Sequence, residues 1–192
     1  MASPRNDNVK ELILSATESL MESQKLSVIS LAKIACAAGI SKGTLYYYYK
    51  TKNSILLDIM DKYLDEQFHD LTIWTENIEK DTSIYRMVKY ILERDIGTIH
   101  MRLHFFYDAM LGNEEIKEQL LVRYREFAHT IAEKIAKRTN SISPQYLSWF
   151  LLILSDGLFI HQTLDNPEVD IPQFILETAR IVDVMIQNSD QK

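Results

Sequence analysis

Apolar residues recur at intervals of three and four along most of the chain, which is the spacing of one face of an α-helix. The stretches that share this spacing cover residues 9–23, 31–38, 41–49, 52–73, 83–96, 99–111, 113–138, 144–164 and 172–187. Strict alternation of apolar and polar residues, which is typical of a half-buried strand, is rare. The pattern therefore predicts an all-α protein of about nine helices.

Polar residues that favour helix ends stand at the boundaries of these stretches. The hydroxyl residues immediately before a helical stretch, where a side-chain oxygen accepts a backbone N–H, are Ser30, Ser41, Thr51 and Ser143. Gly39 follows the stretch 31–38 and is suited to the left-handed conformation that ends a helix. Two short helices joined at Gly39 predict a helix-turn-helix.

The second helix of this pair, residues 41–49, has one packing face and one polar face. Leu45 and Tyr49 stand four positions apart and are predicted to pack against the preceding helices. Gly43 has no side chain, so the backbone there is able to approach a partner closely. Two neighbouring rows of hydrogen-bond donors, suited to base edges or phosphates, contain Lys42, Tyr46, Thr44 and Tyr48. For Tyr47 and Tyr49, packing in the core is the ordinary alternative.

Charge is distributed unevenly along the chain. Residues 1–52 hold seven lysines and arginines against four acidic residues, a net charge of +3. The remaining residues, 53–192, carry −9, which brings the whole chain to −6. A basic head on an acidic body suits a protein that contacts phosphate with its head alone.

The stretch from Ile34 to Lys52 resembles the signature of the TetR family of bacterial transcriptional regulators. The matching positions are Ile34, Ala35, Ala38, Gly39, Ile40, Ser41, Gly43, Thr44, Leu45, Tyr46, Tyr49 and Lys52. The rest of the chain resembles the family only in helix pattern and length. Lys25 departs from the family, which usually has glycine there, and a left-handed Lys25 would cost about 1 kcal/mol. Tyr49 replaces the usual phenylalanine, so its hydroxyl needs a partner.

The resemblance implies an all-helical homodimer with a DNA-binding domain at residues 1–50 and an effector-binding and dimerisation domain at residues 51–192. It also implies that Lys42, Gly43, Thr44 and Tyr46 face the major groove, whereas Tyr48 and Lys52 contact phosphates. The DNA-contacting set that we predict consists of Ser30, Ser41, Lys42, Gly43, Thr44, Tyr46, Tyr47, Tyr48 and Lys52.

The segment 146–160 is apolar almost all round, and a helix without a polar face is buried on every side. In so small a domain, one of its sides is expected to meet a second subunit together with the last helix. The predicted interface residues are Phe150, Leu154, Leu158, Ile181, Val182 and Met185. A dimer would set two recognition helices about 34 Å apart, as a palindrome requires. A monomeric core is the alternative.

Aromatic and polar residues also concentrate in the middle helices, and we expect them to line a pocket for an aromatic or amphipathic small molecule. The predicted lining consists of Trp74, His100, His104, Phe105, Asp108, Tyr124, Trp149 and Ile153. His100, His104 and Asp108 stand four apart, which also suits a metal or a solvated helix face. We predict neither metal nor cofactor.

The function predicted from these features is a ligand-responsive repressor that leaves a palindromic double-stranded operator when a small molecule binds the body. The signal is expected to pass through the joint at residues 50–52. Activation, constitutive DNA binding, and small-molecule binding without switching are the alternatives. No Ser/His/Asp order or glycine-rich phosphate loop suggests an enzyme.

Features of the chain that bear on its compartment agree with one another. A single cysteine, Cys36, fits a reducing compartment. No apolar run follows a basic start at the N-terminus, as a signal peptide requires. The segment 146–160 is shorter than the roughly 20 apolar residues of a membrane span. We expect a cytoplasmic protein with no membrane contact.

Overall fold

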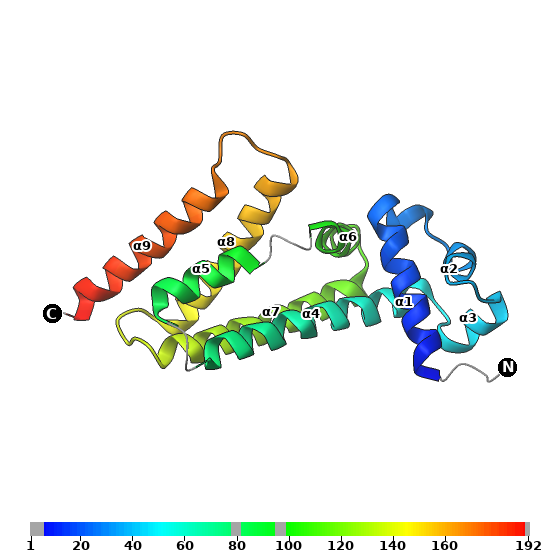
Figure 1. Ribbon diagram of the computed structural model, residues 1–192, viewed down its shortest axis with the longest axis horizontal. Coiled ribbons are helices and arrows are strands. Elements are labelled where there is room, and N and C mark those ends of the chain that lie inside the picture. The colour runs from blue at the N-terminus through cyan, green and yellow to red at the C-terminus, as the bar shows by residue number, and fades with distance from the viewer. Residues whose placement is uncertain (1–5, 78–81, 95–98, 191–192) are drawn as a thin grey trace. The chain divides into compact units, whose positions relative to one another are not determined.

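The computed structural model of the protein describes residues 6–77, 82–94 and 99–190. Within these ranges the chain forms nine α-helices and one short 3₁₀ helix, η1 (Leu26–Val28) (Figure 1). The α-helices are α1 (Asn6–Ser23), α2 (Leu31–Ala37), α3 (Lys42–Tyr48), α4 (Lys52–Glu76), α5 (Ile84–Arg94), α6 (Ile99–Met110), α7 (Glu114–Ala136), α8 (Pro144–Thr163) and α9 (Ile171–Asp190). The predicted all-α class is confirmed.

The helix starts follow the predicted caps. The side chain of Ser41 accepts the backbone N–H of Thr44 at 3.0 Å, and that of Thr51 accepts the N–H of Ser54 at 3.1 Å. Ser30 and Ser143 cap α2 and α8 in the same way. Local side-chain bonds of this kind replace the partners that the first turn of a helix lacks.

The turns between the first helices have the conformations that their residues favour. Gly39 has a φ of +66°, the left-handed value predicted for it. Lys25 instead has a φ of −67° and a ψ of 141°, an extended conformation that is open to any residue. The replacement of the family's glycine by Lys25 therefore introduces no backbone strain.

By its internal packing the chain divides into two compact units. Unit 1 comprises residues 1–66 and 100–121, and unit 2 comprises residues 67–99 and 122–192. The division falls inside α4 and α7, so these helices contribute residues to both units. The functional boundary expected near residue 50 is a different kind of division and stays a prediction.

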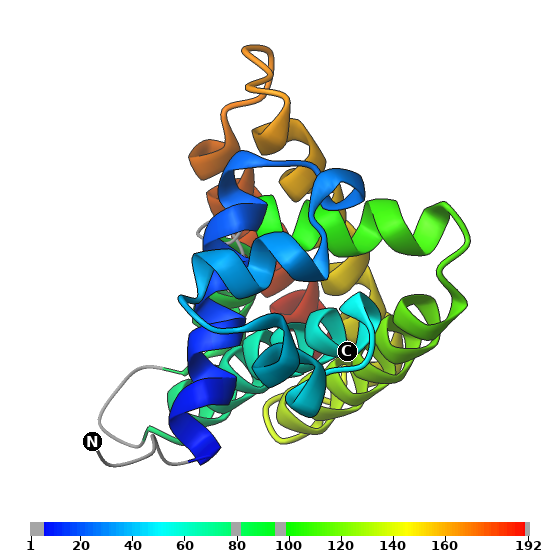
Figure 2. The same cartoon turned by 90° about the vertical axis from the view of Figure 1, so that its right-hand side faces the viewer.

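In unit 1, α1, α2 and α3 pack with the beginning of α4, and Figure 2 looks onto this part of the chain. Ile13, Ile34, Leu45 and Ile55 are completely buried in a core that these four helices share. Phe105 of α6 and Ile116 of α7 belong to the same core. This packing holds the short helix α3 in place, since a helix of seven residues has little stability alone.

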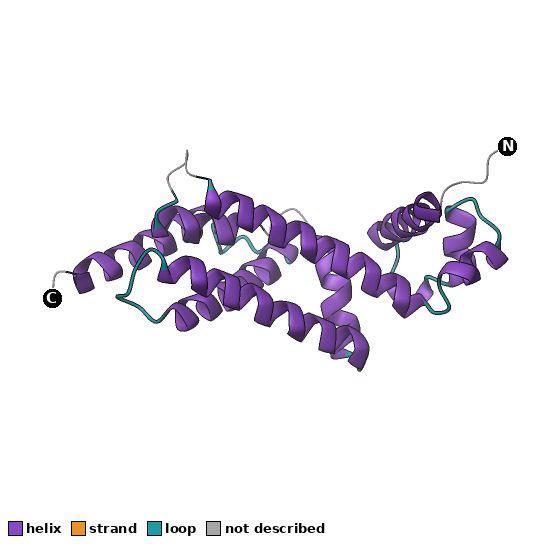
Figure 3. Ribbon diagram, turned by 90° about the horizontal axis from the view of Figure 1, so that it is seen from below, coloured by secondary structure: helices purple, strands orange, loops and turns teal. Residues whose placement is uncertain are grey.

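In unit 2, α5 packs against α8 and α9. The buried residues of these helices include Met87, Val88, Ile91, Leu151, Leu158, Ile175, Ala179, Val182 and Ile186. The described residues contain helices and loops without a strand (Figure 3). Among them, no helix combines the length and the apolar character that crossing a bilayer requires.

Candidate nucleic-acid interface

Helix α3 is anchored at both ends and along one face. Ser41 caps its start, and its hydroxyl also lies 2.8 Å from that of Thr44. Leu45 is fully buried and Tyr49 is 3% exposed, so both residues pack inward as predicted. The backbone N–H of Tyr49 donates to the carbonyl of Leu45 at 2.9 Å, and the helix ends there. The opposite face of α3 is thereby held toward solvent.

The exposed face of α3 is rich in phenols. Tyr46 is 47% exposed and Tyr47 is 73% exposed, which excludes the core-packing alternative for Tyr47 within unit 1. Lys42 is also exposed, while Thr44 and Tyr48 are half-buried. The rings of Tyr47 and Tyr48 meet edge to face, with centroids 5.2 Å apart. The predicted donor rows therefore lie on the solvent-facing side of α3 and at its margin, where they present an ammonium group and phenols.

Gly43 lies on the same helix, and the fold of the chain does not itself require a glycine there. A Cβ at this position would meet only the hydroxyl of Ser41, at an ordinary contact distance of 3.7 Å. The backbone at Gly43 is exposed. The missing side chain thus opens the backbone to an outside partner rather than relieving a contact within the unit.

The remaining predicted DNA contacts are partly engaged within the chain. The ammonium of Lys52 donates to the carbonyl of Leu26 at 2.7 Å and so ties the start of α4 to η1. Lys50, which is not in the predicted set, donates to the carbonyl of Tyr46 at 2.6 Å, near the end of α3. Ser30 is exposed, but its hydroxyl oxygen caps α2. An ammonium has three donors, so the bond made by Lys52 does not prevent a phosphate contact.

Sequence reasoning missed a polar cluster behind α3. The hydroxyl of Tyr49 donates to Oδ2 of Asp58 at 2.7 Å, and the ammonium of Lys10 bonds the same oxygen at 3.2 Å. Burial, and next the hydrogen bond to Asp58, raise the pKa of Tyr49 above its ordinary value. The tyrosine in place of phenylalanine was the signal, because it required a partner that the sequence did not identify.

Three of the predicted pocket residues belong to unit 1. The ring of His104 bonds the carbonyl of Met21 at 2.8 Å through Nε2, and Phe105 is 2% exposed within the core of this unit. Asp108 accepts a hydrogen bond of 2.7 Å from the side chain of Asn113. These residues hold α6 within unit 1. The side chain of His100 lies outside the described residues.

The other predicted pocket residues belong to unit 2. Trp74 stacks on Tyr90 with ring centroids 4.5 Å apart. The hydroxyl of Tyr124 lies 2.8 Å from both carboxylate oxygens of Asp156. Trp149 and Ile153 are 40% and 67% exposed. The predicted lining is therefore split between the units, and its role as one pocket stays a prediction.

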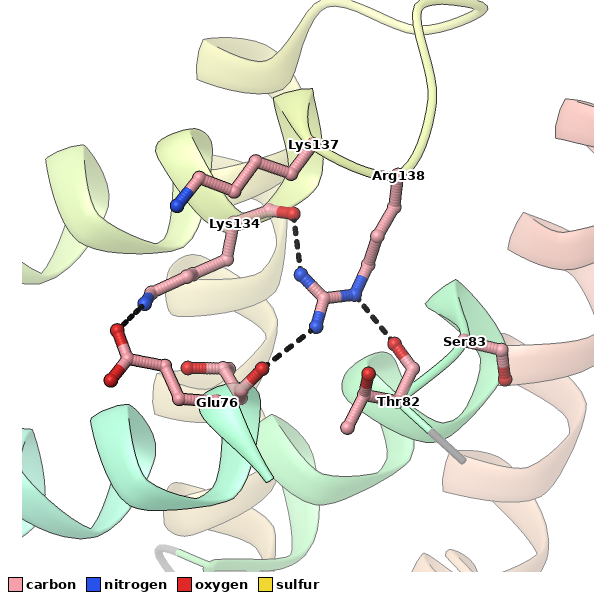
Figure 4. Close-up of a pocket in the computed structure, with 7 residues that line it drawn as sticks. Glu76, Thr82, Ser83, Lys134, Lys137 and Arg138 are labelled. Atoms are coloured by element: carbon pink, nitrogen blue, oxygen red, sulfur yellow. Dashed lines mark hydrogen bonds and ion pairs between the residues drawn. The ribbon is translucent and has the colours of Figure 1, made fainter. Parts of the chain in front are cut away.

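The described residues of unit 2 form at least two hollows outside the predicted pocket. The first is an open depression of about 560 Å³ and is lined by Thr75, Glu76, Thr82, Ser83, Lys134, Lys137 and Arg138 (Figure 4). The second is an open depression of about 570 Å³ and is lined by Leu154, Gly157, Leu158, His161, Glu168, Val169, Asp170, Gln173, Phe174 and Glu177. Neither includes a residue of the predicted pocket.

Arg138 makes several hydrogen bonds to backbone carbonyls at the first hollow. Its guanidinium donates to the carbonyls of Thr82, Lys134 and Thr75 at 2.5, 2.8 and 3.1 Å. Burial lowers the pKa of Arg138. Beside it, the ammonium of Lys134 lies 2.7 Å from Glu76, and this bond lowers the pKa of that carboxyl (Figure 4). These polar groups join the end of α4 to α7, so they have a structural role without any ligand.

The predicted dimer residues fall into two groups. Leu158 and Val182 are 6% and 5% exposed, because they pack within unit 2. The others lie outward or partly so: Phe150, Ile181 and Met185 are exposed, and Leu154 is half-buried. Helices α8 and α9 thus have apolar residues on their outer faces, and the interface itself stays a prediction. No metal-binding group of three or more His, Cys, Asp or Glu occurs among the described side chains.

Comparisons with known proteins agree with this architecture. A sequence profile of bacterial regulatory proteins of the tetR family matches residues 13–59. The HTH-type transcriptional regulator EthR of Mycolicibacterium smegmatis is 37% identical over 169 residues, which cover 85% of this chain and 76% of that protein. EthR of Mycobacterium tuberculosis is 34% identical over 76 residues, 40% of this chain and only 35% of that protein.

Solved structures share the fold at low sequence identity. A TetR transcription regulator from Haloarcula marismortui has a TM-score of 0.74 at 18% identity, over 95% of this chain and 98% of that one. FadR from Bacillus subtilis, in complex with stearoyl-CoA, has a TM-score of 0.68 at 12% identity, over 92% and 97% of the two chains. With the M. smegmatis relative covered over most of its length, these matches lead to one assignment. The chain belongs to the TetR family of bacterial regulatory proteins.

Proposed function

We propose that the protein is a DNA-binding transcriptional regulator that inserts α3 into the major groove of a duplex. The observation that carries the proposal is the exposed face of α3, where Lys42, Tyr46 and Tyr47 extend from a helix anchored by Leu45 and Tyr49. The major groove is wide enough for an α-helix and exposes a distinct set of donors and acceptors at each base pair. Residues 1–50 are the part to which we assign this contact.

Each side chain of this face has a role that its chemistry permits. Lys42 has three ammonium donors for guanine acceptors or for phosphate oxygens. The hydroxyls of Tyr46 and Tyr47 donate to acceptors on bases or phosphates, and Gly43 allows the backbone to come close to the duplex. Thr44 and Tyr48, which are half-buried, complete the face at its margin. Tight binding then depends on a fixed helix orientation as well as on these donors.

We propose that the protein acts as a homodimer on a palindromic operator. Apolar side chains on the outer faces of α8 and α9, among them Phe150 and Ile181, support an interface made of these two helices. Two copies related by a two-fold axis would present two α3 helices to half-sites about one helical turn of DNA apart. Residues 51–192 would carry this interface.

We further propose that a small aromatic or amphipathic molecule binds the C-terminal domain and releases the operator. The B. subtilis relative of similar fold binds stearoyl-CoA, a large amphipathic ligand, which supports this effector class. Such a ligand must bind the released state more tightly than the DNA-bound state, because equal affinity for both shifts neither. We propose no catalytic role.

Selection of duplexes from a random library by the purified full chain tests the proposal. The selected sequences are expected to contain two inverted half-sites spaced about one helical turn apart. Mobility shifts at low and physiological salt then separate specific from nonspecific binding, since the latter depends mainly on counterion release. A chain that selects no duplex even at low salt would show that the proposed function is wrong.

A further inference from the structure

One carboxylate oxygen behind the exposed face of α3 joins three helices of unit 1. Oδ2 of Asp58, in the second turn of α4, accepts the hydroxyl proton of Tyr49 at 2.7 Å. It also accepts a proton of the ammonium of Lys10, from α1, at 3.2 Å. The same ammonium lies 5.3 Å from the centre of the Tyr49 ring. α1, the end of α3 and α4 therefore meet at a single acceptor.

The position of Tyr49 at the end of α3 allows its bond to Asp58 to fix the orientation of α3 relative to α4. Tyr49 is the residue at which α3 ends, and its backbone has turned to an extended conformation with φ −134° and ψ 121°. Only Lys50 and Thr51 separate it from the first residue of α4. A bond from Tyr49 to Asp58 thus closes a short loop between the two helices. Such a bond restricts the angle between the axes of α3 and α4.

The hydroxyl of Tyr49 contributes to orientation more than to burial. The ring is 3% exposed, and a phenylalanine ring would fill the same space in the core of unit 1. The side chains of Lys10 and Asp58 are 51% and 41% exposed, so water is able to replace the phenol at the carboxylate. Loss of the hydroxyl is therefore expected to change stability little at neutral pH and to loosen the angle between α3 and α4.

We propose that Tyr49 and Asp58 are positioning residues that set operator affinity without touching DNA, and that Lys10 orients the Asp58 carboxylate. The inference rests on the proposed DNA-binding function and deepens it. The exposed donors of α3 then meet the groove at one angle rather than over a range of angles, and a fixed angle lowers the entropy lost on binding.

Operator affinity of the full chain, measured on the duplex that the wild-type protein selects, tests the role of Tyr49. Tyr49→Phe is expected to weaken binding about tenfold, because a wider range of α3 orientations increases the entropy lost on binding, with an unchanged melting temperature. The same chemical change at the exposed Tyr107 of α6 is the matched control and should leave affinity unchanged. Equal affinity of wild type and Tyr49→Phe would overturn the proposal.

Asp58 gives a sharper test, because charge and positioning predict opposite effects. Removal of an acidic group from the DNA-binding head should tighten binding if only electrostatics matters. The proposal instead expects Asp58→Ala to weaken binding about tenfold, and Asp58→Asn, which keeps an acceptor for the phenol, to retain most of the affinity. Tighter binding by Asp58→Ala, or equal weakening by both variants, would overturn the positioning role.

The affinity of a double variant and hydrogen exchange test whether Tyr49 and Asp58 act through the bond between them. The double variant Tyr49→Phe/Asp58→Ala should bind DNA no more weakly than whichever single variant binds more weakly, because both changes break the same bond. Additive losses of affinity would contradict the proposal. Hydrogen exchange of the amide of Tyr49, which donates to the carbonyl of Leu45 at 2.9 Å, should be faster in Tyr49→Phe, and unchanged exchange would also overturn the proposal. If the wild-type chain selects no duplex, the proposed function fails, whereas wild-type binding with unaffected variants removes this inference alone.

Discussion

Asn113, in the turn between α6 and α7, exchanges two hydrogen bonds with Asn53 in the first turn of α4. The side-chain amide of Asn53 donates to Oδ1 of Asn113 at 3.3 Å, and that of Asn113 donates back to Oδ1 of Asn53 at 3.1 Å. Oδ1 of Asn113 also caps α7 by accepting the N–H of Ile116 at 3.3 Å. One side chain therefore both starts a helix and ties it to the helix that follows α3.

Replacement of the Asn113 side chain should lower the stability of the protein. Asn113→Ala removes the cap of α7, the amide pair with Asn53 and the bond to Asp108, and we expect a loss of about 1–3 kcal/mol in the free energy of unfolding. Urea unfolding followed by circular dichroism measures it. Asn140→Ala, at an exposed loop position, should stay within about 0.5 kcal/mol of wild type. Equal stability of the two variants would show that the Asn113 network contributes nothing.

The exposed face of α3 leads to a direct prediction for DNA binding. Lys42→Ala and Tyr46→Ala should each weaken specific operator binding by about 1–3 kcal/mol if each loses one base contact. Fluorescence anisotropy with the selected operator measures this loss. Lys137→Ala, which removes an exposed lysine from unit 2, is the control and should bind as wild type does. If both α3 variants keep full affinity, α3 is not the recognition helix.

Alkaline pH should reveal the environment of Tyr49. Its pKa is raised in the folded chain, so between the ordinary tyrosine pKa of about 10 and the folded value the unfolded state releases a proton that the native state keeps. The contribution of Tyr49 to stability is thus complete below pH 10 and declines as pH rises above it. Between pH 8 and pH 11, the free energy of unfolding should fall more in wild type than in Tyr49→Phe. Parallel losses would indicate an ordinary phenol at this position.

The outer faces of α8 and α9 should determine the oligomeric state. Ile181→Glu puts a charge on a residue that is 58% exposed in the single chain, and we expect a shift from dimer to monomer together with loss of operator binding. Sedimentation velocity gives the mass. Leu111→Glu introduces the same charge at a 68% exposed leucine in the α6–α7 turn and should remain dimeric. A dimeric Ile181→Glu would place the interface elsewhere.

Arg138 should stabilise unit 2 through its geometry as well as its charge. Arg138→Ala leaves the carbonyls of Thr75, Thr82 and Lys134 without this donor, and we expect a loss of about 2–3 kcal/mol in the free energy of unfolding. Arg138→Lys should recover only part of it, because a single ammonium cannot replace a planar group with five donors. Thermal and urea unfolding check both variants. Full recovery by lysine would mean that charge alone is responsible.

The elements that the sequence predicted depend on interactions between near neighbours. Ser41 bonds the backbone of Thr44, three residues away, and Gly39 adopts a conformation that depends on its own missing side chain. The inward positions of α3, Leu45 and Tyr49, follow from a spacing of four. Such features are contained in any short stretch of the chain, so the helices and the helix-turn-helix were predictable without further information.

The contacts of the predicted pocket residues were less predictable, because proximity along the chain does not decide which residues meet. The sequence pattern groups His104, Phe105 and Asp108 with Trp74 and Tyr124, whereas the first three pack in unit 1 and the other two in unit 2. Aromatic and polar composition indicates burial with a partner but does not identify that partner. The hollow around Arg138 also escaped prediction, since its lining comes from segments about 60 residues apart.

By itself the amino-acid sequence determined the helical class, the helix ends and the donor-bearing face of α3, because each depends on residues within one or two turns of one another. Only the tertiary structure decided that the Asp58 carboxylate accepts hydrogen bonds from both Tyr49 and Lys10, although Lys10 is 48 residues away from Asp58 in the chain. The same is true of the bond from Lys52 to the carbonyl of Leu26. Such contacts form when separate helices pack on a shared core, and the direction of each side chain there depends on every helix around it.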